Sequence, residues 1–101
     1  MFIIYSTFPN KEEALKIRKK LLEEKLVGCF NMVPITSGYW WEGRVVIAEE
    51  FGVIFKVSEE KVDKTFKRLR NLHPYKIPVI LCLKVNRVNE EYERWIRRVT
   101  E

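Results

Sequence analysis

The sequence predicts an α+β fold in which two helices cover one face of a mainly antiparallel sheet. Short runs of β-branched and aromatic residues alternate with amphipathic helical segments. Two of these runs meet at Glu42-Gly43, which favours a long central hairpin. The predicted order is β-α-β-β-α-β-α, and its first six elements match the βαββαβ sandwich called ferredoxin-like. We expect one domain over residues 1–101, closed by a C-terminal helix.

The first strand is predicted at residues 2–8, where the chain is rich in β-branched and aromatic side chains. Asn10 and Glu13 have the spacing of a capping box, so a helix should follow and run to about residue 26. The apolar positions of that helix fall on one face: Ala14, Ile17, Leu21 and Leu22.

The central hairpin is predicted from residues 27–41 and 44–57, with Pro34 breaking or bending the first strand. Neighbouring strand residues point to opposite faces. Trp40 and Trp41 therefore cannot enter the same core, so one should pack under the helices and the other face the open side. An exposed tryptophan there indicates a surface that binds a partner chain.

The second half begins with Ser58, a favourable N-cap, followed by two glutamates that suit the first turn of a helix. This helix should end at His73-Pro74, because the residue before proline avoids the helical region. A strand over 79–85 follows, and Asn89 should cap the last helix. The apolar positions of these two helices are Val62, Phe66 and Leu69, then Tyr92, Trp95, Ile96 and Val99.

Charge and composition favour a soluble cytoplasmic protein. Charged residues make up 33% of the chain and the net charge is +5, but acids and bases alternate. This pattern is typical of a solvated surface and not of a nucleic-acid face. We expect neither a secretory signal nor a membrane span. Cys29 and Cys82 lie in strand-like runs, so both should be buried thiols without a disulfide.

Few residues indicate chemistry. His73 is the only histidine, and a metal site would need further ligands from scattered positions. The candidates are Cys29, Cys82, Glu42, Glu49 and Glu50. The sequence has no phosphate-binding glycine loop and no recognisable nucleophile motif, so we expect a protein that is not an enzyme. A small phosphatase using Arg44 or His73 is the least favoured hypothesis.

Several motifs together resemble the CutA family of divalent-cation-tolerance proteins, over almost the whole chain. They are Tyr5-Ser6-Thr7-Phe8-Pro9, Cys29-Phe30-Asn31, Tyr39-Trp40-Trp41-Glu42-Gly43, His73-Pro74-Tyr75 with Pro78, and Asn89-Glu90-Glu91-Tyr92. The resemblance implies a tight homotrimer whose hairpin strands reach neighbouring subunits. It also implies intersubunit clefts near Tyr5, Trp40, Trp41, Lys56 and Tyr75.

The resemblance further implies binding of copper(II) or another divalent cation, for which we expect His73 and Glu42 to be weak ligands. The family's cysteine ligand corresponds to Ser6 and its first histidine to Leu72, which removes two ligands that copper prefers. The alternative is a regulatory or scaffold trimer, similar to the PII signalling proteins. Such a trimer would bind a small anion or a partner protein in the cleft through Lys56, Trp41 and Tyr75.

Overall fold

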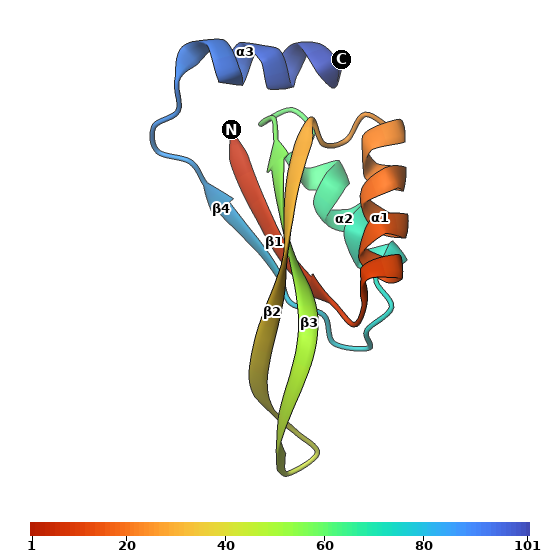
Figure 1. The fold of residues 1–101 in the computed structure, drawn as a ribbon. Helices are drawn as coiled ribbons and strands as arrows, with labels where there is room; N and C mark the ends of the chain where they lie inside the picture. The colour runs from red at the N-terminus through yellow and green to blue at the C-terminus, as the bar shows by residue number, and fades with distance from the viewer.

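A computed structural model describes residues 1–101 and confirms the α+β, ferredoxin-like arrangement (Figure 1). Four antiparallel strands form one sheet in the order β2-β3-β1-β4. The elements are β1 (Phe2–Phe8), α1 (Lys11–Glu23), β2 (Cys29–Trp41), β3 (Arg44–Val57), α2 (Val62–Leu72), β4 (Ile80–Lys84) and α3 (Glu90–Val99).

The core lies between the sheet and the helices α1 and α2, which cover the same face (Figure 1). The sheet contributes Ile4, Phe8 and Phe55, and each is fully buried. The helices contribute the predicted positions Ala14, Ile17, Leu21, Val62 and Leu69. The predicted stripes were too wide, because Leu22 and Phe66 are 37% and 39% exposed at the margins of their helices.

Several predicted features of the elements were wrong, including the starts of β2 and β4, which begin at Cys29 and Ile80. The first helix ends at Glu23, two residues before Lys25, whose φ of 57° is left-handed. The second helix starts at Val62, because residues 58–61 form a turn in which the Lys61 amide donates to the Ser58 carbonyl at 3.1 Å. Pro34 does not interrupt β2, which is an edge strand where a missing amide donor is tolerated.

The hairpin of β2 and β3 extends beyond the helices as a twisted two-stranded arm (Figure 1). Its tip has positive φ at both Glu42 and Gly43, the backbone that a type I′ turn requires. Trp40 and Trp41 are 74% and 40% exposed, so the expectation that one packs under the helices was wrong. The arm outruns α1 and α2, and no helix covers either of its faces there.

The C-terminal helix α3 lies across the opposite end of the sheet (Figure 1). Ile96 is its fully buried residue, and a methyl group added at Gly28 would lie 2.7 Å from the Ile96 Cδ1 atom. Gly28 therefore permits the close approach of α3. The prediction of two buried cysteines was wrong, since Cys29 is half-buried and Cys82, on an edge strand, is exposed.

The face of the sheet opposite α1 and α2 is apolar and largely uncovered. Alternation along β1 places Ile4, Ser6 and Phe8 toward the helices, so Tyr5 and Thr7 point to this open face. Val33, Leu81 and Leu83 are 50% to 56% exposed. Their pairing registers with β3 and β1 place them on the same open face. None of the helices has the length and apolar character needed to cross a membrane.

Candidate functional site

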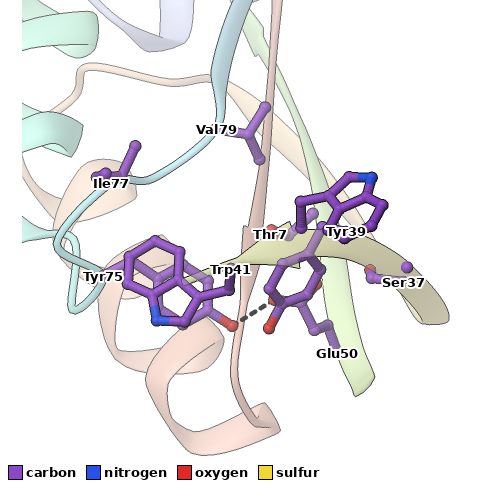
Figure 2. A pocket seen from close by; sticks show the side chains of 10 residues that line it. Thr7, Ser37, Tyr39, Trp41, Glu50, Tyr75, Ile77 and Val79 are labelled. Carbon is purple, nitrogen blue, oxygen red and sulfur yellow. Dashed lines mark hydrogen bonds between the residues drawn. The ribbon is translucent and has the colours of Figure 1, made fainter. Parts of the chain in front are cut away.

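A groove of about 620 Å³ lies on the open side of the sheet, between the hairpin arm and the segment that joins α2 to β4. Figure 2 shows its aromatic and polar side chains. The lining residues are Thr7, Ser37, Gly38, Tyr39, Trp40, Trp41, Glu50, Tyr75, Ile77 and Val79. This volume falls in the range of small-molecule sites, which are mostly apolar with a few placed polar groups.

One wall of the groove is the segment 73–79, and β1 anchors it through Ser6. The Ser6 hydroxyl donates to the Val79 carbonyl at 2.7 Å and lies 2.9 Å from Nε2 of His73. Nδ1 of His73 lies 3.2 Å from the Tyr75 amide. Ser6 and His73 are both buried. The segment is therefore fixed at its two ends by one serine.

These contacts determine the tautomer of His73. The single hydroxyl proton of Ser6 is used on the Val79 carbonyl, so Ser6 can only accept from the imidazole. Nε2 must then carry the proton and donate it to Ser6. Nδ1 carries the lone pair that accepts the Tyr75 amide proton. Both ring nitrogens are engaged, so His73 has no free lone pair for a ligand.

Burial also keeps His73 neutral. The imidazole stacks on the Phe8 ring with centroids 4.6 Å apart and an interplanar angle of 14°. Loss of contact with water disfavours the charged imidazolium and lowers the pKa of His73 below its ordinary value. His73 thus serves as a neutral structural group that positions the residue two places further on, Tyr75.

Tyr75 connects this wall to the sheet. Its hydroxyl donates to Oε2 of Glu50, a residue of β3 that is only 7% exposed (Figure 2). Burial, followed by the hydrogen bond to Glu50, raises the pKa of Tyr75. The phenol therefore stays protonated and donates, while the second carboxylate oxygen of Glu50 receives no side-chain hydrogen bond.

The structure brings together three of the five predicted cleft residues. Trp40, Trp41 and Tyr75 all line the groove. Tyr5 lies on the same open face but beside Gly52, outside the lining. Lys56 lies six residues along β3 from Glu50, a separation of about 20 Å at the usual rise of a strand. Its ammonium group instead lies 3.9 Å from the Cys29 sulfur.

The predicted metal ligands are not brought together within the chain. Glu42 is exposed at the tip of the arm, whereas His73 is buried beside β1. Leu72 packs against the core, and Ser6 uses its hydroxyl on Val79. No group of three or more histidine, cysteine, aspartate and glutamate side chains could hold a metal ion. The residues at the implied copper positions therefore do not form a copper site in one subunit.

Sequence reasoning missed the roles of Glu50, Tyr39 and Thr7 in the groove. Glu50 carried a signal, because it is an acid directly before the apolar end of a strand, and alternation places it on the face opposite Phe51. Thr7 carried none, since its contribution depends on where the 73–79 segment returns to the sheet.

Comparison with known proteins agrees with the fold and the motifs. The chain matches the family described as CutA1 divalent ion tolerance protein over residues 2–99. The divalent-cation tolerance protein CutA of Thermotoga maritima is 52% identical over 97 residues, which are 96% of each chain.

Solved structures match over the full length. The structure described as the periplasmic divalent cation tolerance protein CutA from Archaeoglobus fulgidus is 39% identical, with a TM-score of 0.94 over 100% of both chains. The PII-like protein CutA from Nostoc sp. PCC 7120 is 30% identical, with a TM-score of 0.93 over 100% of this chain and 98% of that one. Identity, coverage and fold agree, and the chain therefore belongs to the family of CutA1 divalent ion tolerance proteins.

Proposed function

We propose that the chain works as a homotrimer that takes part in tolerance of divalent cations. The observation that carries the assembly is the uncovered apolar face, where Val33, Leu81 and Leu83 are half exposed beside an arm that extends past its own helices. A neighbouring copy would cover this face and pack beside the arm, whose aromatic side chains are of the kind enriched in interface cores. The role in cation tolerance is supported by the name that the relatives carry. No catalytic step is assigned, and the cytoplasm is the proposed compartment.

Native mass spectrometry of the purified protein tests this assembly directly. We expect a trimer that persists on dilution. A chain that stays monomeric at all concentrations would contradict the proposal, because its apolar face would then be stable in water.

For the metal, we propose weak binding of copper(II) or another divalent cation at the exposed Glu42, not at His73. Both nitrogens of His73 are already hydrogen-bonded, and a metal would have to displace Ser6 or the Tyr75 amide. A single carboxylate is a poor site for copper(II), which prefers imidazole and thiolate ligands.

The same spectra recorded with copper(II) test this proposal. We expect only loosely held copper, reduced in Glu42→Gln and unchanged in His73→Gln. Three tightly held ions per trimer that are lost in His73→Gln would show that the imidazole is a ligand after all.

A second candidate function is regulatory binding of a small ligand or a partner protein in the groove. The groove of about 620 Å³ with its aromatic lining favours it, and one relative is described as PII-like. The predicted ligand class was a small anion held by Lys56. No lysine, arginine or histidine lines the groove, so an anion would need a basic side chain from a neighbouring subunit.

A thermal-shift screen against neutral, anionic and cationic metabolites tests this candidate. A bound ligand raises the melting temperature as its concentration rises. Silence across all three classes would count against a regulatory groove.

A further inference from the structure

The groove has an unusual combination of side chains for a neutral or anionic ligand. Its walls carry four aromatic rings, from Tyr39, Trp40, Trp41 and Tyr75, and its only ionisable carboxyl group is that of Glu50. Figure 2 shows the ring of Tyr39 beside the Tyr75–Glu50 pair. Aromatic faces carry negative electrostatic potential, so rings and carboxylate attract the same sign of charge.

Glu50 is built into the groove and is not a mobile surface acid. Its side chain is among the few buried charged groups of the protein, and one oxygen is held by the Tyr75 hydroxyl. Tyr75 is itself fixed through its amide by His73, which is fixed by Ser6. The other oxygen of Glu50 has no side-chain hydrogen bond and is not among the fully buried atoms, so it remains open to a cationic ligand.

Other ligand classes fit less well. An anion would meet Glu50 without any positive group in the lining. A hard divalent cation needs about six oxygen ligands, and the lining offers one carboxylate with the hydroxyls of Thr7, Ser37 and Tyr39. A monovalent organic cation needs one negative group and several aromatic faces, and the groove supplies both.

We propose that the groove binds a small organic cation of the alkylammonium class, with Glu50 as its counter-ion and the tyrosine and tryptophan rings around its methyl groups. This inference rests on the second candidate function, a small-ligand site in the groove, and names the chemistry of that ligand. Apolar lining residues such as Ile77 and Val79 would contact the uncharged part of the ligand.

The test uses two probes of nearly equal shape. Choline carries a trimethylammonium group, and neohexanol carries a tert-butyl group in its place, so only the charge differs. Both are titrated calorimetrically into the native protein at the same salt concentration, and its assembly is measured separately by native mass spectrometry. We expect choline to bind at least about tenfold more tightly than neohexanol.

Equal binding of the two probes would overturn the cation proposal while leaving a small-ligand groove intact. Binding of neither probe to a trimer would also overturn it, and would indicate that a neighbouring subunit fills the groove. Because assembly is measured independently, failure of the trimer and failure of the cation site are distinguishable.

Matched variants locate the site. In Glu50→Gln the amide oxygen can still accept from Tyr75, so the wall should stay in place while the charge is lost. We expect this variant to bind choline about tenfold more weakly and neohexanol as before. Glu49→Gln is the control, because Glu49 is exposed and lies outside the groove lining, where its carboxylate accepts a hydrogen bond from the Thr36 hydroxyl. Loss of choline binding in the control, or its retention in Glu50→Gln, would overturn the assignment.

Discussion

Replacing Ser6 by alanine would test whether the groove wall is held by the buried Ser6–His73 contact. Ser6 is fully buried, and its hydroxyl makes two hydrogen bonds, at 2.7 Å to the Val79 carbonyl and at 2.9 Å to Nε2 of His73. The variant would leave the Nε2 proton of His73 without a partner in a buried position. An unsatisfied buried group costs about 1 to 3 kcal/mol, and the second lost bond adds about 1 kcal/mol. We expect Ser6→Ala to lower the free energy of unfolding by about 2 to 4 kcal/mol.

Guanidinium denaturation at a fixed chain concentration measures this loss, because the midpoint of an oligomer depends on concentration. Ser37→Ala is the control, since Ser37 lies on β2 and its hydroxyl forms no hydrogen bond with the 73–79 segment. It should change stability by less than about 0.5 kcal/mol. If Ser6→Ala cost no more than this control, the argument that one serine fixes both ends of the wall would be wrong.

Three further predictions concern His73, Trp41 and Gly28. The fold lowers the pKa of His73 below its ordinary value of 6.5, so on acidification the unfolded chain takes up a proton before the folded chain does. The contribution of neutral His73 to the free energy of unfolding is therefore complete above pH 6.5 and decreases as the pH falls. Denaturation at neutral pH and at about pH 5 measures this decrease in the free energy of unfolding, which should be larger in wild type than in His73→Gln. Equal decreases in the two proteins would contradict the prediction. Trp41→Ala should weaken the proposed trimer by about 2 kcal/mol, whereas Lys19→Ala on the surface of α1 should not. Light scattering on dilution measures the mass of each variant's assembly. If both variants stayed trimeric to the same dilution, the assignment of Trp41 to the interface would be wrong. Gly28→Ala should destabilise the chain by about 1 to 3 kcal/mol, because the added methyl group would lie 2.7 Å from the Ile96 side chain. An unchanged melting temperature would show that α3 can shift to make room for the methyl group.

Local patterns predicted most of the fold. Strand β3 begins and ends where alternation and the Glu42-Gly43 turn placed it, and Asn10 caps α1 through its bond to the Glu13 amide at 2.9 Å. The wrong predictions concern positions whose structure depends on contacts with residues far away in the sequence. Phe66 fits the apolar period of α2 but falls outside the contact with the sheet. Ser58 has the chemistry of an N-cap, yet the chain makes an extra turn before α2 begins.

The groove was predicted only in part, because a site made by three segments has no continuous sequence signal. The aromatic run from Tyr39 to Trp41 was conspicuous, and Tyr75 followed from its neighbours in the motif. Lys56 was placed in the cleft by the resemblance, but in one subunit it lies at the far end of β3, beside Cys29. Only the register of β3 shows that Glu50, and not Lys56, supplies the charge of the groove.

The contrast between His73 and Glu50 determines how future variants should be interpreted. Histidine is a common metal ligand, yet both ring nitrogens of His73 form hydrogen bonds that hold the segment carrying Tyr75. A His73 substitution that weakens ligand binding would therefore show displacement of the wall, not loss of a ligand. Tyr75→Phe separates the two effects, because it keeps the ring and the His73 contact while releasing the oxygen of Glu50. If Glu50 is the counter-ion, Tyr75→Phe should bind choline no more weakly than wild type, whereas His73→Ala should bind it less well.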